Sequence, residues 1–238
     1  MRHIRWIGLI VAIAAALACF EPHVRQVLAD LLVVFRGRAT CAMRLEEYGG
    51  TARARLAPYF RKAGIEYRSD RLVFVGLKCE QRLEVYAERG SKLYHIRDYP
   101  ILAASGDLGP KLRYGDGQVP EGIYRIQWLN PNSRFHLSMR LDYPNEFDRA
   151  RAAKEGRGNL GGDIMIHGGG QSCGCIAVGD EASEDLFVLA ADVGVQNIKV
   201  ILSPVDFRVR DLPPDMRRLP RWTKGLYKQV RGELACLP

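Results

Sequence analysis

The first periodic segment of the chain predicts an amphipathic helix. Apolar side chains recur at helical spacing on one face, namely Leu56, Tyr59, Phe60 and Ala63. Gly64 follows directly, and glycine commonly ends helices because it adopts the left-handed conformation at low cost. We therefore expect a helix that ends near residue 63.

After this helix the pattern changes to the period-two alternation of short strands. Apolar residues alternate with polar neighbours at Leu83, Val85 and Ala87. A hairpin turn is predicted within residues 88–92, and a loop rich in glycine and proline leads into a further strand at residues 122–129. The centre of the chain is therefore expected to form a sheet.

The clearest alternation lies in RFHLSMRLDYPNEFD, residues 134–148. Its apolar set is Phe135, Leu137, Met139 and Leu141, and its polar set is His136, Ser138, Arg140 and Asp142. The pattern predicts a strand with one packed face and one polar face. His136 and Arg140 are candidates for lining a substrate groove, and the alternative is that both are solvated strand residues.

The remaining elements complete a β-rich α+β fold. They are a short strand ending at His167, a helix over residues 180–194 capped near Asp180 or Ser183, a closing strand over residues 195–204, and a helical piece near residues 222–234. Acidic residues in the first turn favour the start of the helix at residue 180.

The N-terminus has the pattern of an export signal. Arg2 and Arg5 precede an apolar run from Trp6 to Phe20, which is short for a membrane span but normal for a signal-peptide core. Ala16-Leu17-Ala18 fits a cleavage site before Cys19, although these residues form a poor lipoprotein signal. We expect an exported protein, periplasmic or anchored in the inner membrane and facing the periplasm.

A second apolar patch, Val27 to Phe35, could extend this segment into an uncleaved anchor. Residues 1–36 are therefore interpreted as a signal peptide or an N-terminal membrane anchor, and a buried helix of the domain is the less favoured interpretation. Whether Cys19 persists in the mature protein stays open.

Composition and charge narrow the function classes only slightly. The 238 residues have room for one large domain or two small ones, and 47% are hydrophobic, as in ordinary globular proteins. The net charge of +8 suits an anionic partner such as a cell-wall polymer. Because no basic motif is interleaved with aromatic residues, a solvated basic surface is favoured and no nucleic-acid partner is expected.

Export changes the interpretation of the six cysteines, because oxidising compartments favour disulfides. Cys41 and Cys79 are a plausible bridge, and Cys236 could fix the C-terminal tail. The sequence does not assign the pairs.

The stretch IMIHGGGQSCGCIAVGD, residues 164–180, concentrates the candidate chemistry. A structural metal needs about four ligands, and no second pair completes His167, Cys173 and Cys175, so no metal is expected. A disulfide between the two cysteines would close a strained ring, although Cys173 could pair elsewhere. Phosphate binding is weakly indicated, because the segment lacks a Walker or dinucleotide pattern.

A cysteine nucleophile fits the same stretch better. A thiol nucleophile needs a base within hydrogen-bond reach and backbone donors for the oxyanion. His167 ends a predicted strand, and it is the sole histidine within thirty residues of either cysteine of the motif. Gly174 frees the backbone beside Cys175 for close approach.

Several ordered blocks resemble one enzyme family. IMIHG…SCGCIAV is similar to the His-Gly…Ser-x-Gly-Cys signature of the L,D-transpeptidase catalytic domain, or YkuD-type, family. LEVYAERGSKLYHIRDYPI, GDGQVPEGIYRI, LDYPNEFD and VQNIKVILSP resemble further family segments. The resemblance covers roughly residues 80–204 and implies a mixed β-sandwich with a helix after the catalytic cysteine.

The resemblance implies a role for each residue of the motif. Cys175 would be the nucleophile, His167 the general base, and the Gly168 carbonyl would orient the imidazole. Amides at Gly174 and Cys175 would form the oxyanion hole, and Ser172 would support the loop. The implied reaction is attack on a peptidoglycan stem-peptide carbonyl at the L-centre of the diamino acid, with no cofactor.

Three departures point to the YafK-type branch of the family. Cys173 replaces a histidine, Ala177 replaces an arginine, and the interval between His167 and Cys175 is short. Some members of that branch are hydrolases that release a lipoprotein from peptidoglycan, so the acceptor, amine or water, stays open. A non-catalytic cell-wall binding module is less favoured, since both reactive residues are present. A redox role for Cys173 is a further hypothesis.

These inferences divide the chain into four expected segments. They are the signal peptide or anchor at residues 1–36, a lead-in at residues 41–79, the catalytic domain at residues 80–204, and a basic C-terminal extension at residues 205–238.

Overall fold

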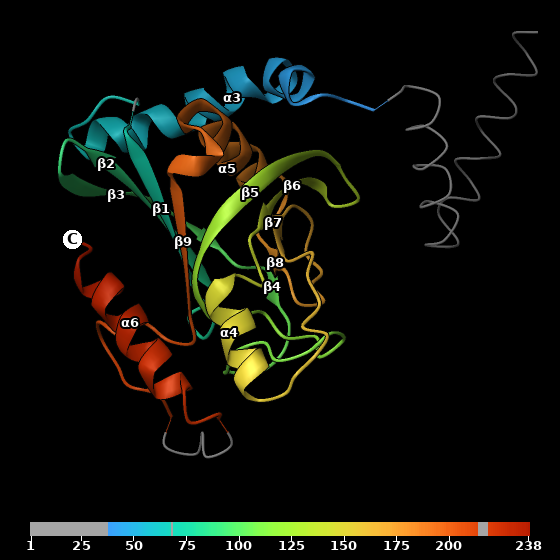
Figure 1. Ribbon diagram of the computed structural model, residues 1–238. Helices are drawn as coiled ribbons and strands as arrows, with labels where there is room; N and C mark the ends of the chain where they lie inside the picture. The colour runs from blue at the N-terminus through green and yellow to red at the C-terminus, as the bar shows by residue number, and fades with distance from the viewer. Residues whose placement is uncertain (1–37, 68, 214–218) are drawn as a thin grey trace, which may run out of the picture. The chain divides into compact units, whose positions relative to one another are not determined.

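The computed structural model describes residues 38–67, 69–213 and 219–238 (Figure 1). The interpretation of residues 1–36 as a signal peptide or anchor concerns residues outside this range. Among the described residues, no helix has both the length and the apolar character needed to cross a membrane. The unit from Cys41 to Pro238 contains all the elements discussed below.

The strands of the described chain form one mixed sheet, in the order β3-β2-β1-β9-β5-β6-β7-β8-β4. Their bounds are β1 Arg71–Leu77, β2 Arg82–Arg89, β3 Lys92–Pro100, β4 Ala103–Ala104, β5 Gly122–Ser133, β6 His136–Leu141, β7 Met165–His167, β8 Ile176–Ala177 and β9 Ile198–Ser203. The pairs β1–β9 and β7–β8 are parallel, and the others are antiparallel. The expected β-rich α+β fold is confirmed.

Four α-helices accompany the sheet in the described chain, α3 Cys41–Lys62, α4 Glu146–Lys154, α5 Asp180–Val193 and α6 Thr223–Ala235. Helices α3 and α5 pack against one another, and α6 lies on another side of the sheet (Figure 1). The predicted helix before Gly64 is present, with Leu56 and Phe60 buried. Tyr59 was expected on the same face, but it is 37% exposed and contacts the Arg97 guanidinium instead.

Two details of the helices differ from expectation. Helix α4 was not predicted, although Asn145 and Asp148 form a reciprocal capping box that satisfies amides at its N-terminus. Helix α5 begins at the predicted place, but its N-cap is Gly179 and no side chain caps it. The prediction of a cap at Asp180 or Ser183 was therefore wrong, since the Ser183 hydroxyl donates to the Asp180 carbonyl instead.

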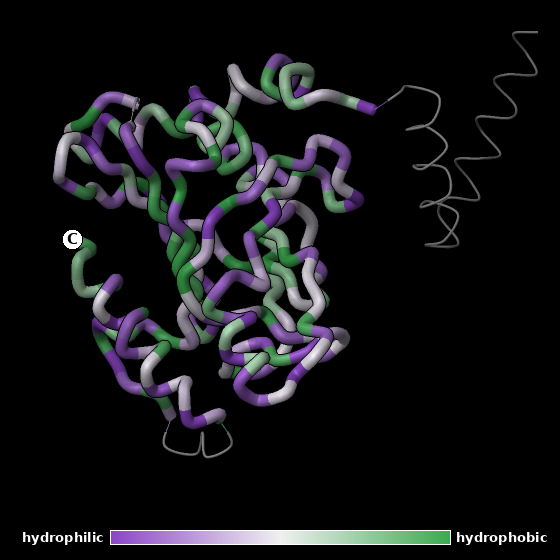
Figure 2. The backbone as a smooth tube through the Cα atoms, viewed as in Figure 1, coloured by the Kyte–Doolittle hydropathy of each residue, from purple (hydrophilic) through white to green (hydrophobic). Residues whose placement is uncertain are grey.

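Strand β1 explains how the sheet is held on both faces. Leu72 and Phe74 belong to the main core with α3 and α5, whereas Val73 and Val75 belong to a second core under α6. A strand covered on both faces has a nearly continuous apolar sequence, as β1 does. In Figure 2 the central part of the protein is correspondingly green, the colour of hydrophobic residues. The lead-in at residues 41–79 thus includes an interior strand of the same sheet.

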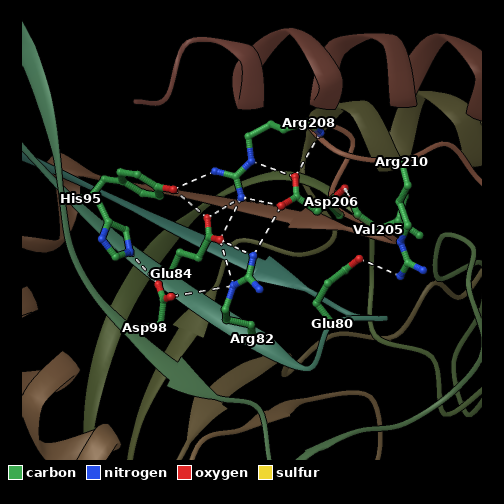
Figure 3. Close-up of polar contacts among 11 residues, drawn as sticks. Glu80, Arg82, Glu84, His95, Asp98, Val205, Asp206, Arg208 and Arg210 are labelled. Atoms are coloured by element: carbon green, nitrogen blue, oxygen red, sulfur yellow. Dashed lines mark hydrogen bonds and ion pairs between the residues drawn. The ribbon is translucent and has the colours of Figure 1, made fainter.

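The segment after β9 is fixed to β2 by a buried ionic network (Figure 3). The Arg208 guanidinium lies 2.8 Å from Glu84 and 2.8 Å from Asp206, and both carboxylates are only 4% exposed. Tyr86 and Arg82 also donate to Glu84. Burial acts to raise the pKa of Asp206, but hydrogen bonds from Arg208 outweigh it and hold that pKa below its usual value.

The Cys41–Cys79 disulfide, which the sequence made plausible without assigning it, is not formed in the described structure, because both cysteines are free, as is Cys236. The Cys41 thiol, at the start of α3, contacts the Leu129 carbonyl oxygen at 3.8 Å. Cys79 instead lies exposed after β1. The number of cysteines in a sequence does not show whether two of them lie close together in the fold.

We predict that Arg208→Met lowers the free energy of unfolding by about 2–3 kcal/mol, because it leaves two buried carboxylates with Arg82 as the one arginine of the described chain that bridges them. Urea denaturation monitored by circular dichroism measures this change. Arg210→Met is the matched control, since the Arg210 side chain is 44% exposed and ion pairs of exposed side chains contribute little. Equal stability of the two variants would contradict a role for the buried network.

Candidate active site

The register of β7 and β8 brings the motif residues together. His167 is paired with Ala177 on the neighbouring parallel strand, and Cys175 directly precedes that strand. Because paired residues of neighbouring strands point to the same face, Ala177 shares the face of His167, and extending that alternation by two residues is expected to put Cys175 on the same face. The register thus brings the backbones of the nucleophile and base candidates close together at one end of β8.

The imidazole of His167 has a defined orientation. Its Nδ1 lies 2.6 Å from the Gly168 carbonyl oxygen, so the proton is assigned to Nδ1 and Nε2 carries the lone pair. Burial lowers the pKa of His167 below its usual value, and the hydrogen bond to Gly168 offsets part of this effect. The residue is only 2% exposed, and its ring is therefore neutral at physiological pH.

The thiol of Cys175 is also neutral in this state. Its Sγ donates to the Asp163 carbonyl oxygen at 3.6 Å, and no hydrogen bond joins it to His167 in the described structure. Burial raises the pKa of the Cys175 thiol, although a hydrogen bond from the Met165 backbone acts in the opposite direction. Asp163 adopts a left-handed conformation, with φ of 55°, which turns its carbonyl toward the cysteine loop.

Two serines hold the loop that carries the nucleophile. The Ser172 hydroxyl donates to the Cys175 carbonyl at 2.6 Å, and it accepts from the Ser105 amide at 3.2 Å. The Gly174 amide donates to the Ser105 hydroxyl at 2.6 Å. The Gly174 amide, one of the two amides expected to form the oxyanion hole, is thus already engaged by Ser105. No sequence motif indicated Ser105 as a residue of the site.

The glycines after His167 make room for neighbouring backbone. A Cβ at Gly168 would lie 2.7 Å from the Phe135 carbonyl oxygen and 2.6 Å from the Asp180 carboxylate. The Gly169 amide already donates to that carboxylate, at 2.8 Å. The Asp180 carboxylate, at the start of α5, thus takes up an amide of the glycine loop and repels phosphate, so the phosphate-binding interpretation finds no support in this geometry.

The two predicted groove residues have different surroundings. Arg140 lies 3.1 Å from the Asp163 carboxylate, and Asp163 in turn accepts from the nucleophile through its backbone. His136 is held by Glu184 of α5, with Nε2 3.0 Å from the carboxylate. Arg140 is therefore linked to the cysteine loop, whereas the His136 ring is engaged on the side of α5.

The predicted polar face of β6 is not a solvated face. Ser138 is only 1% exposed, and its hydroxyl contacts the Met165 sulfur at 3.2 Å, because β7 follows β6 in the sheet. Phe135 was assigned to the packed face but is 42% exposed and stacks on His167. The strand begins one residue later than the alternation indicated, so Phe135 lies in the β5–β6 turn.

The sequence and the fold define a known family of catalytic domains. Residues 70–201, more than half of the chain, match the YkuD family, the L,D-transpeptidase catalytic domain. The chain belongs to this family.

Among individual relatives, YafK of Escherichia coli (strain K12), which carries the name of an L,D-transpeptidase, is 34% identical over 139 residues. The alignment covers 56% of this chain and 53% of YafK, so the chain spans about half the length of the curated relatives it matches.

Solved structures give more distant likenesses. The helical cell shape determining protein Pgp2 of Campylobacter jejuni is 23% identical, with a TM-score of 0.47 over 58% of this chain and 49% of Pgp2. L,D-transpeptidase 1 of Mycobacterium tuberculosis is 17% identical, with a TM-score of 0.33 over 56% of this chain and 62% of that protein.

The packing around the glycines predicts a contrast between two alanine substitutions. Gly168→Ala places a methyl group against the Phe135 backbone and the Asp180 carboxylate, so we expect a loss of about 1–3 kcal/mol in unfolding free energy. Gly170→Ala meets nothing within 4 Å and is expected to be neutral. Thermal and urea unfolding of both variants measure the contrast, and equal stability would show that the loop tolerates a side chain at residue 168.

Proposed function

We propose that this protein is an exported cysteine acyltransferase that acts on peptidoglycan stem peptides. The observation that carries the proposal is the fixed tautomer of His167, whose Nδ1 is occupied by the Gly168 carbonyl so that Nε2 is available to the Cys175 thiol, just before the adjacent strand β8. Membership of the L,D-transpeptidase family supports the reaction class. The proposed location is the periplasm, with residues 1–36 as the signal or anchor.

The first half-reaction is formation of a thioester. The Cys175 thiol turns from the Asp163 carbonyl toward the imidazole, and Sγ attacks the stem carbonyl carbon while its proton passes to His167 Nε2. The Cys175 backbone N–H stabilises the oxyanion, since the Gly174 N–H already donates to the Ser105 hydroxyl. When the tetrahedral intermediate collapses, the C–N bond breaks and the leaving amine takes the proton from the imidazolium.

The second half-reaction regenerates the thiol. An amine of another stem, or water, gives a proton to Nε2 and attacks the thioester carbonyl, and the C–S bond breaks as Sγ recovers the proton. An amine acceptor yields a cross-link or attaches a new group, whereas water releases the stem. Release of a lipoprotein from peptidoglycan would be the hydrolytic form of the same chemistry.

The electrostatics of the site favour proton transfer during attack. Burial raises the pKa of the Cys175 thiol and lowers the pKa of His167, so the proton stays on sulfur in the resting enzyme. A preformed thiolate–imidazolium pair would need shifts in the opposite directions. His167 therefore acts as a general base when the carbonyl is in place.

We predict a covalent adduct on Cys175 when the full chain is incubated with tetrapeptide muropeptides. Peptide mapping by mass spectrometry is expected to show the acyl mass at Cys175 and a stoichiometric release of the terminal D-residue. Cys175→Ala should abolish both signals. Cys173→Ala is the matched control, because that cysteine is exposed and two positions away, and it should retain the adduct.

Product analysis with and without an added amine separates the two acceptors. An aminated product identifies a transferase, and free stem in both conditions identifies a hydrolase. Turnover that persists in Cys175→Ala, with no adduct in the unmodified chain, would contradict the mechanism.

We predict that the rate of thioester formation falls only at unusually low pH. The reaction requires neutral His167, and burial lowers the pKa of that imidazole, so protonation occurs only below the ordinary value of about 6.5. Half-maximal acylation is therefore expected at a pH below 6.5, with the rate falling further as the pH decreases. Rates from rapid-quench mass spectrometry between pH 5 and 8 test this, and a midpoint above pH 7 would contradict a neutral base.

A further inference from the structure

An exposed aromatic ring covers the candidate catalytic base. Phe135 stacks on the imidazole of His167, with ring centroids 4.6 Å apart and an interplanar angle of 28°. Phe135 is 42% exposed, whereas His167 is 2% exposed, so the phenyl ring forms part of the cover between the imidazole and solvent. Offset-stacked geometry of this kind fixes the plane of both rings.

The glycines of the motif permit this approach. A Cβ at Gly168 would lie 2.7 Å from the Phe135 carbonyl oxygen, and a Cβ at Gly169 would lie 3.7 Å from the Phe135 ring. The Gly168 amide donates to the Leu137 carbonyl at 3.1 Å, which ties the segment to the same hairpin. The backbone after His167 is therefore in direct contact with the residues that carry the stacked ring.

The conformation of the turn that carries Phe135 depends on the next residue, His136. His136 adopts a left-handed conformation, with φ of 69°, which is uncommon for a residue other than glycine. Its ring lies 3.0 Å from the Glu184 carboxylate and packs edge-on against Tyr48, with centroids 5.1 Å apart. These contacts from α5 and α3 hold the conformation that places Phe135 over His167.

Helix α3 contacts the same hairpin at two further points. The Arg44 guanidinium donates to the Pro131 carbonyl at 3.0 Å, and the Cys41 thiol contacts the Leu129 carbonyl at 3.8 Å. The first two turns of α3 thus fix the end of β5 that leads into the Phe135 turn. A helix outside the family match, which begins at residue 70, supports the ring beside the base.

We propose that Phe135 is a positioning residue for His167, and that α3 and α5 set its place through the β5–β6 turn. The stacked ring keeps the imidazole in the plane in which Nδ1 meets the Gly168 carbonyl and Nε2 points toward the cysteine side. It also excludes water from one face of the imidazole. The inference rests on the proposed role of His167 as base.

Nitrogen NMR of the full chain labelled with ¹⁵N-histidine tests the inference directly, with His167 assigned by its loss in His167→Gln. In Phe135→Ala we expect the pKa of His167 to rise toward its ordinary value, because part of its burial is lost, and the Nδ1–H tautomer to lose its predominance. Cys175 acylation at pH 7 should fall by about tenfold or more, as expected when a reacting group loses its alignment.

Two control variants separate the stacked ring from aromatic packing in general. Phe135→Tyr keeps the stacked ring and should retain the His167 spectrum and the acylation rate. Trp128→Ala removes an equally exposed aromatic residue, 41% exposed, from the same hairpin and should leave the His167 resonances unchanged. The high exposure of Phe135 makes a folded Phe135→Ala variant the expected case, and circular dichroism checks it.

A Phe135→Ala chain with an unchanged His167 pKa and tautomer would overturn the inference, even if acylation fell, because Phe135 would then act on the substrate instead. Absence of any thioester in the unmodified chain would contradict the proposed function. The His167 spectra would still decide whether Phe135 positions the ring, so the two failures are distinguishable.

Discussion

The parallel register between β7 and β8 is the constraint on which the site depends. It pairs His167 with Ala177 and thereby brings the backbone of Cys175, two residues earlier, close to the strand that carries the imidazole. A slip of one residue would turn the thiol to the opposite face of the sheet, where it would meet the apolar core instead. The other contacts of the site hold β7 and β8 in this register. Ser105 and Ser172 hold the loop before β8, and the β5–β6 hairpin packs on the glycines after β7.

Burial then determines the chemistry that this arrangement supports. The core leaves His167 almost inaccessible, which keeps the imidazole neutral and basic at Nε2, and it keeps the proton on the Cys175 sulfur. In the proposed mechanism, these two effects mean that the Cys175 thiol loses its proton to His167 only when the substrate carbonyl is in place. The Asp163 carbonyl gives the idle thiol a partner. Such a resting state limits side reactions of the thiol, since the thiolate is the reactive form.

Local pattern and motif spacing predicted much of the fold and led to His167 and Cys175, but they did not predict contacts made across the chain. The alternation in residues 134–148 indicated β6, yet it assigned Phe135 to the core, because nothing in the alternation shows that His136 is left-handed. Ser105 contacts Ser172 across 67 positions, and no local signal marks such a pair. Helix α4 was missed although its capping box is visible in the sequence. The Cys41–Cys79 bridge failed because counting cysteines ignores distance.

The proposed mechanism depends above all on a resting enzyme that holds a neutral thiol beside a neutral imidazole. The rate of Cys175 alkylation by iodoacetamide as a function of pH, followed by mass spectrometry of the peptide, tests this state most directly. We expect Cys175 to react slowly at pH 7, more slowly than the exposed Cys173 in the same sample, and its rate to keep rising with pH, without a plateau, to beyond the ordinary thiol pKa of about 8.5. A fast rate at Cys175 that stays constant down to pH 6 would reveal a preformed thiolate–imidazolium pair and contradict the neutral resting state.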